Sequence, residues 1–182
     1  IARKPSGQAY SNLGTSLYYA GRYKEAAAAL EKAVEMEPHY YVYWRNLGDA
    51  YRWVAGSEAK ASNAFEKAIE LCDDAIRVNA SDAVAHAAKA GALAKLGRER
   101  QARASILRAL ELEPKDPTLA YEAALVANLS GSEEEAATRL AQSLRLGFNP
   151  TDAEHDPEFA NMRKSGTLQT VISDFRSSNQ NK

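Results

Sequence analysis

Residues 10–17, which read Tyr-Ser-Asn-Leu-Gly-Thr-Ser-Leu, decide the fold because their pattern returns 34 residues later. Residues 44–51 read Trp-Arg-Asn-Leu-Gly-Asp-Ala-Tyr, so the aromatic residue, the leucine and the glycine keep their places. A second series, of glycine, alanine, a large apolar residue and a small residue, occurs at one spacing as Gly21, Ala26, Leu30 and Ala33, as Gly97, Ala102, Ile106 and Ala109, and as Gly131, Ala136, Leu140 and Ser143. A period of this length is typical of helical repeats that stack on one another.

This pattern resembles the tetratricopeptide repeat (TPR), in which each unit is an antiparallel pair of helices. The resemblance covers roughly residues 7–147 and implies an all-α fold, an α-α superhelix of about four helical hairpins. We expect a single TPR domain over residues 1–182, with repeats at about 7–40, 41–80, 83–116 and 117–147 and with connector and capping helices over 148–176. The expected helices are 7–20, 23–36, 41–54, 58–78, 82–96, 99–112, 116–129 and 132–146.

Small residues at matching places explain how the two helices of a hairpin can approach closely. Gly14 and Gly48 on the first helices are expected to face Ala26 and Ala61 on the second helices. Larger side chains would then fill the space on either side of these contacts. Glycines just past the first helices, such as Gly21, suit a backbone with positive φ at the end of a helix.

One repeat departs from the period, since Gly56 and Gly97 are 41 residues apart. The additional residues continue an apolar pattern of helical spacing, and no glycine or proline interrupts it. Seven residues are close to two helical turns, so the apolar stripe stays nearly in register. We therefore expect one lengthened helix over residues 58–78, whose extension is either a harmless overhang or a specialised contact surface.

The repeat pattern stops after Gly147. Residues 148–156 are expected to form a polar connector, and six large apolar residues between Phe159 and Phe175 outline two short helices. We expect these helices to cover the exposed end of the last hairpin, because the terminal unit of a repeat stack needs a cap.

Composition argues against several classes of function. The net charge of −1 gives no general attraction to nucleic acid or to an anionic membrane, and the basic stretch from Lys95 to Arg108 lacks aromatic residues and is interpreted as a solvated face. No apolar run has the length that crosses a membrane. Cys72 is the only cysteine, which suits a reducing compartment, and we expect a cytoplasmic location. Because the chain opens at Ile1, we interpret it as a fragment of a longer protein.

Enzyme signatures are absent from the sequence. It contains no nucleophile elbow, no phosphate-binding loop, no zinc-protease helix and no Cys-x-x-Cys pair. His155 lies among Asp152, Glu154 and Asp156, but acidic residues near a helix N-terminus also favour the helix dipole. We therefore interpret this cluster as helix-terminus residues, and the sequence predicts no catalytic residue, no metal and no cofactor.

The resemblance also implies where a partner would bind. TPR proteins bind along the first helices of their repeats, and carrying those positions over residue by residue gives a groove whose first half is polar and aromatic and whose second half is small. The candidate groove residues are Ser11, Asn12, Thr15, Tyr19, Arg45, Asn46, Asp49, Arg52, Trp53 and Tyr121. Aromatic residues and arginine are the residues that binding hot spots favour. Tyr18 also falls at a groove position of the first repeat, and the alternative for Trp53 and Tyr18 is that they pack between repeats.

One binding activity of the family can be tested on the sequence alone. Co-chaperone TPRs hold a C-terminal carboxylate with lysine, asparagine and arginine side chains. At the matching positions this chain has Ser11, Thr15, Asn46, Val84 and Ala88, so only the asparagine is kept. We therefore reject a carboxylate clamp.

Two functional hypotheses remain. The first is a non-catalytic protein–protein interaction module that binds a peptide or helix of a partner in its groove. The second rests on the run from Tyr43 to Trp53, on the lengthened helix, and on the ending formed by residues 146–148 and 156–159. Together these features resemble the C-terminal TPR arrays of bacterial multidomain signalling proteins. That resemblance implies an intramolecular regulatory or self-association scaffold, in contact with an N-terminal domain that the sequence does not include.

Overall fold

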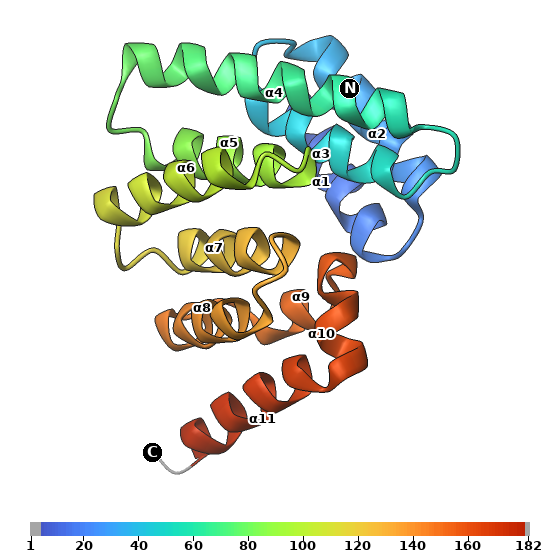
Figure 1. Cartoon of the computed structure of the whole chain (residues 1–182). Coiled ribbons are helices and arrows are strands. Elements are labelled where there is room, and N and C mark those ends of the chain that lie inside the picture. Colours follow the sequence, from blue (N-terminus) through green and yellow to red (C-terminus); the bar gives the residue numbers. More distant parts are fainter. Residues whose placement is uncertain (1–4, 181–182) are drawn as a thin grey trace. The chain divides into compact units, whose positions relative to one another are not determined.

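The computed structural model describes residues 5–180, which form helices and no β-strand (Figure 1). The all-α class predicted from the repeat is therefore confirmed. The chain divides into two compact units, Ile1–Ala80 and Ser81–Lys182. The first unit contains α1 (Gly7–Tyr19), α2 (Tyr23–Met36), α3 (Tyr41–Arg52) and α4 (Glu58–Val78). The second contains α5 (Ala83–Lys95), α6 (Glu99–Leu112), α7 (Pro117–Leu129), α8 (Glu133–Leu146), α9 (Pro150–His155), the 3-10 turn η1 (Pro157–Phe159), α10 (Ala160–Ser165) and α11 (Thr167–Gln180).

The helices α1 to α8 pair in sequence order, as the repeat predicts. Their ends lie within two residues of the expected ones, and the closest packing is within the pairs α1–α2, α3–α4, α5–α6 and α7–α8. The turn glycines Gly21, Gly56, Gly97 and Gly131 all have positive φ, between 71° and 79°. Each hairpin therefore reverses through a left-handed residue that only glycine adopts without strain.

Close helix approach in the first unit occurs at Gly14 and Gly48, and the atoms nearest to both glycines belong to large apolar side chains of the second helices. The nearest side chain to Gly14 is Leu30, and the nearest to Gly48 is Phe65. The large residue of the second helix therefore lies directly over the glycine. The physical reason is volume, because a missing Cβ leaves room that a large apolar side chain fills.

The lengthened helix predicted over residues 58–78 is confirmed as the single helix α4. Its last turn carries Val78, whose side chain is 91% exposed. Ala75 and Ile76 in the same turn are half-buried, so the exposed apolar side chain of this turn is that of Val78. Among residues 5–180 no helix has both the length and the hydropathy that a membrane span requires.

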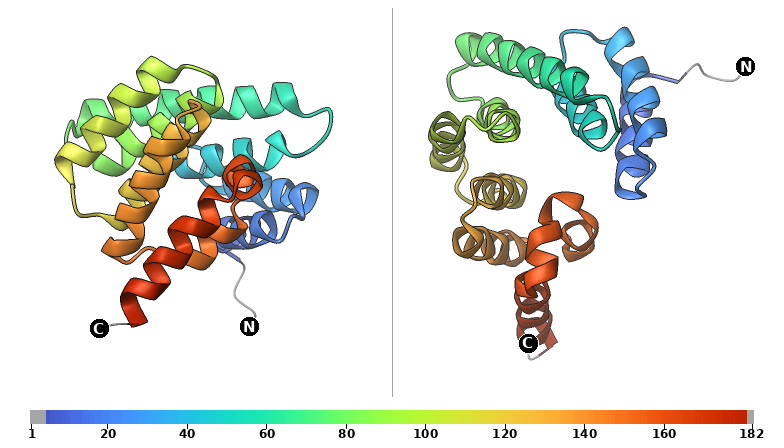
Figure 2. Two further views of the ribbon diagram at one scale, coloured as in Figure 1. Left: turned by 60° about the horizontal axis from the view of Figure 1, so that its bottom comes forward. Right: turned by 45° about the vertical axis from the view of Figure 1, so that its right-hand side comes forward.

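The C-terminal part of the second unit differs from the expected polar connector. Residues 150–155 form the short helix α9, which begins because the Asn149 side chain accepts from the Thr151 amide and Pro150 takes the first helical position. Ala153 on this helix is fully buried. Farther along, α11 packs against α8, as the ribbon in Figure 2 shows.

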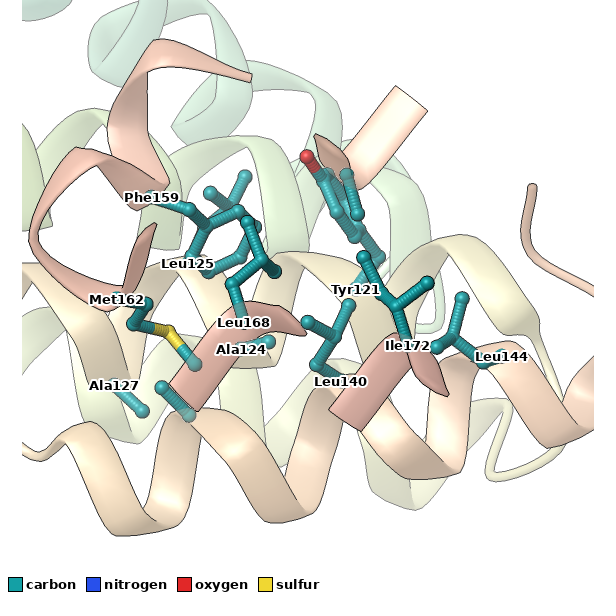
Figure 3. Packing of buried hydrophobic residues seen from close by; sticks show 12 residues of the cluster. Tyr121, Ala124, Leu125, Ala127, Leu140, Leu144, Phe159, Met162, Leu168 and Ile172 are labelled. Atoms are coloured by element: carbon teal, nitrogen blue, oxygen red, sulfur yellow. The ribbon is translucent and has the colours of Figure 1, made fainter. Parts of the chain in front are cut away.

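Side chains from α7, α8, α9, η1, α10 and α11 form one apolar cluster in this unit (Figure 3). Phe159 and Met162 of the C-terminal segment are completely buried in it, as is Leu140 of α8. The segment after the last hairpin therefore contributes buried side chains to the apolar cluster of the second unit.

Candidate binding surfaces

Helices α1 and α3 of the first unit carry most of the candidate groove residues, and they pack against each other. On α1, Asn12 is exposed, and Thr15 and Tyr19 are half-buried. Ser11 is buried and belongs to the same stripe of α1 as Gly14, which lies against Leu30 of α2. Ser11 is therefore corrected from a groove residue to an interior residue.

On α3, the candidate residues become more accessible toward the C-terminal end of the helix. Arg45, Asn46 and Asp49 are half-buried, whereas Arg52 and Trp53 are exposed. The Trp53 side chain keeps 40% of its surface accessible. The end of α3 therefore offers a guanidinium group and an indole ring side by side in the sequence.

Trp53 is held in place by a series of aromatic contacts that we call the aromatic ladder: Tyr19, Tyr18, Tyr23 and Trp53. The Trp53 ring stacks on Tyr23, with centroids 5.6 Å apart and an interplanar angle of 24°. Tyr23 meets Tyr18 edge to face at 5.6 Å, and Tyr18 meets Tyr19 in the same way at 5.4 Å. Aromatic pairs at these distances and angles are stabilising, so the exposed indole is fixed before any partner arrives.

Tyr23 is the member of the ladder that sequence reasoning missed. It begins α2, a second helix, whereas the candidate groove residues were taken from first helices. A usable signal existed, because Tyr23 comes two residues after the turn glycine Gly21 and must lie close to the end of α1, where Tyr18 and Tyr19 are found.

In the second unit, the chain's own C-terminal segment covers the candidate residue on α7. Tyr121, the candidate residue on α7, is buried. Its ring stacks on Phe148 with a centroid distance of 4.0 Å and an interplanar angle of 12°, and it meets Phe159 edge to face at 5.7 Å. Tyr121 is therefore corrected from an open groove residue to one that the chain's own C-terminal segment covers.

Hydrogen bonds attach the same segment to α7. The Tyr121 hydroxyl donates to Oδ2 of Asp156 at 2.6 Å. The Asn128 amide donates to the main-chain carbonyl of Glu158 at 2.7 Å, and it exchanges hydrogen bonds of 3.1 and 2.9 Å with the Asn161 amide. These contacts lie on the first-helix positions where the family binds its partners.

The carboxyl group of Asp156 has the most perturbed environment in this segment. Burial raises its pKa from 3.8 to about 6, against the lowering effects of the Tyr121 hydroxyl and the Glu158 amide. The neighbouring Glu158 carboxylate raises the pKa further, and the Lys95 ammonium lowers it. The folded protein therefore binds a proton at Asp156 more tightly than the unfolded chain does.

This shift predicts a pH dependence of stability that Asp156→Asn removes. Because the folded pKa lies above the unfolded one, the stabilising effect of the proton is complete below pH ~4 and is lost as the pH rises through about 6. The linked change is on the order of 3 kcal/mol, so the variant should be more stable than the wild type at pH 8 and similar to it at pH 4.

Urea unfolding of the two proteins between pH 4 and pH 8 measures this difference. Asp152→Asn, a change at an exposed carboxyl group of the same segment, is the matched control and should follow the wild type throughout. If the free energy of unfolding changes with pH in the same way for wild type and Asp156→Asn, the pKa of Asp156 is not raised in the folded protein.

No group of three or more histidine, cysteine, aspartate or glutamate side chains within residues 5–180 is placed to hold a metal ion. The side chains of these surfaces carry aromatic rings, amides and charged groups.

Comparison with known proteins agrees with the hairpin geometry. Models of the tetratricopeptide repeat match residues 11–83 and 83–116. Small glutamine-rich tetratricopeptide repeat-containing protein 2 of Mycosarcoma maydis is 37% identical over 57 residues, which make up 31% of this chain and only 16% of that protein.

Two solved structures show the same fold. A thermophilic TPR protein of Thermus thermophilus is 23% identical, with a TM-score of 0.51, and the match covers 90% of this chain and 100% of that one. PilF of Pseudomonas aeruginosa is 20% identical, with a TM-score of 0.52, and the match covers 94% of this chain and 75% of that one.

Proposed function

Since this chain is a tetratricopeptide-repeat protein, we propose that it is a non-catalytic interaction module that binds an extended peptide or a helix of a partner protein. Tetratricopeptide repeats mediate protein–protein interaction and generally act as scaffolds. The proposed surface lies on the first unit and consists of Asn12, Thr15, Tyr19, Asn46, Asp49, Arg52 and Trp53, with Arg45 half-buried beside them. A cytoplasmic location is part of the same proposal.

The observation that carries the proposal is the aromatic ladder. A tryptophan that only packed between repeats would be covered, yet Trp53 keeps 40% of its surface accessible while Tyr23 fixes its orientation. A fixed, exposed indole beside an exposed arginine loses little conformational entropy when a partner binds. Tryptophan and arginine are also the residues that contribute most often to binding hot spots.

The polar residues of the surface suit a peptide main chain. Asn12 and Asn46 carry amide groups that can both donate and accept hydrogen bonds, as a peptide main chain requires. Asp49 and Arg52, three residues apart on α3, lie on one face of the helix and offer both signs of charge. The surface thus combines an aromatic anchor with hydrogen-bonding groups, which favours a protein ligand.

The double variant Arg52→Ala/Trp53→Ala tests the proposal. We expect it to keep its helical circular dichroism and to lose capture of the partners that the wild-type chain enriches from cell lysate. The physical reason is that both side chains are exposed, so their removal affects binding more than folding. Quantitative mass spectrometry of the captured proteins is the measurement.

The chain offers a matched control in Leu107→Ala/Arg108→Ala. Leu107 is also 40% exposed and is followed by an exposed arginine, but this pair lies on α6, a second helix. The control should capture partners as the wild type does. Loss of capture in the control alone would move the docking surface to α6 and refute the proposed site.

The same variants distinguish self-association from partner binding. Sedimentation of the wild-type chain and of Arg52→Ala/Trp53→Ala over a range of concentrations reports the oligomeric state directly. A wild-type oligomer that dissociates in the variant would assign this surface to self-association in a regulatory scaffold of a larger signalling protein.

A further inference from the structure

The α7 face formed by Tyr121, Leu125 and Asn128 already holds a ligand-like segment. The segment is residues 148–161, which we call the C-terminal latch. Phe148 stacks on Tyr121, and the carboxyl group of Asp156 accepts from the Tyr121 hydroxyl. Phe159 and Leu125 are buried in the same apolar cluster (Figure 3).

The contacts between α7 and the latch are of the kinds by which proteins recognise peptides. Asn128 donates to a main-chain carbonyl, that of Glu158, which is a contact independent of side-chain identity. Tyr121 contributes two selective contacts, one to an aromatic ring and one to a carboxyl group. Peptide recognition usually combines hydrogen bonds to the peptide main chain, which give affinity, with contacts to particular side chains, which give specificity.

The secondary structure of the latch is that of a segment that can unfold locally. It consists of α9, η1 and the beginning of α10, none longer than six residues, and helices this short have little stability of their own. Two left-handed glycines, Gly147 and Gly166, flank the short elements with φ of 109° and 85°. The longer helices α8 and α11 on either side pack against each other, so both ends of the latch stay anchored when it opens.

We propose that this α7 face is a second peptide-recognition surface, which the chain's own latch occupies in cis. Its ligand class is a peptide that presents an aromatic side chain and a carboxylate to Tyr121 and a main-chain carbonyl to Asn128. Because both ends of the latch are tethered, its effective concentration at α7 is high, on the order of millimolar. An external peptide therefore binds only where the latch is weakened.

A labelled synthetic peptide with the sequence of residues 147–162 tests this proposal by fluorescence anisotropy. At pH 5, below the raised pKa of Asp156, the full-length wild-type chain should not bind it, whereas the latch variant Phe148→Ala/Asp156→Ala should. A peptide that carries the same two substitutions should bind neither protein. Adding Asn128→Ala to the latch variant should weaken peptide binding by roughly tenfold or more, because Asn128 makes hydrogen bonds to both Glu158 and Asn161 of the peptide sequence.

A matched control comes from exposed residues of the same segment. The variant Thr151→Ala/Asp152→Ala changes exposed side chains of α9 and should exclude the peptide as the wild type does. A latch variant that stays cooperatively folded and still does not bind the peptide overturns the proposal.

Hydrogen exchange of the wild-type chain provides a test that needs no variant. The amides of α9 and η1 should exchange through an opening that leaves α7, α8 and α11 protected. If these amides exchange only together with α7 and α8, the latch is part of the core and the proposal is wrong. The Arg52→Ala/Trp53→Ala variant should not change either result, so failure here and failure of the proposed partner surface are distinguishable.

Discussion

Gly48→Ala should lower the free energy of unfolding by ~1–3 kcal/mol, although alanine is the better helix former. A Cβ atom at residue 48 would lie 2.5 Å from Cε1 of Phe65 and 2.7 Å from its Cδ1. Both residues are buried, and Phe65 is only 1% exposed, so the ring can give way only by disturbing its neighbours. The gain in helix propensity, ~1 kcal/mol, offsets only part of this overlap.

Gly91→Ala is the matched control, since Gly91 is also a buried glycine in the interior of a first helix. There the added Cβ would meet only one atom, Oε2 of the buried Glu122, at 3.3 Å, so that side chain has to shift by only a few tenths of an ångström. This variant should be neutral or more stable by up to ~1 kcal/mol. Equal shifts of the urea midpoint for the two substitutions would mean that Phe65 does not pack on Gly48 as described.

The helices α1 to α8 could be predicted from the sequence because their signals are local and repeated. A turn glycine, an apolar stripe and a small residue at the close contact recur in each repeat, so an error in one repeat is corrected by the others. The lengthened α4 was predictable for the same reason, since its added residues extend a pattern that was already present. The side chain over Gly14 is also part of the repeat, since Leu30 occupies the large apolar position of the second helix.

The covered face of α7 could not be predicted, because the contacts that cover it join residues far apart in the sequence. Tyr121 and Asp156 are 35 residues apart, and neither has a local signal that it will be buried. The acidic and polar residues around His155 are typical of a solvated connector, yet Asp156 is 4% exposed. Burial of such a carboxyl group depends on tertiary partners, here the Tyr121 hydroxyl and the Glu158 amide.

For the candidate groove residues of the first unit, burial could also not be predicted from residue type. Ser11 and Asn12 are neighbours in a polar stretch of α1, and the family resemblance assigns both to the groove. One is buried and the other exposed, because successive residues of a helix point in directions about 100° apart. Residue type does not show which of the two is buried. The position of Ser11 on the same stripe of α1 as the buried Gly14 does.

Leu168→Ala should have a still larger effect than Gly48→Ala, lowering the free energy of unfolding by roughly 2–5 kcal/mol. Leu168 on α11 is 1% exposed and belongs to the apolar cluster that joins α11 to α7 and α8. Removing three side-chain carbons there leaves a cavity that the surrounding helices cannot close without moving α11. Thermal or urea unfolding followed by circular dichroism measures the change.

The neighbouring Gln169→Ala provides the control, because Gln169 lies on the exposed side of the same helix and its loss should change stability by less than ~0.5 kcal/mol. The comparison decides whether α11 caps the last hairpin. A cap has to stay in place when the latch opens, so its apolar contacts must contribute to global unfolding. If Leu168→Ala unfolds at the same urea concentration as Gln169→Ala, α11 is an appendage, and α7 and α8 are stable without it.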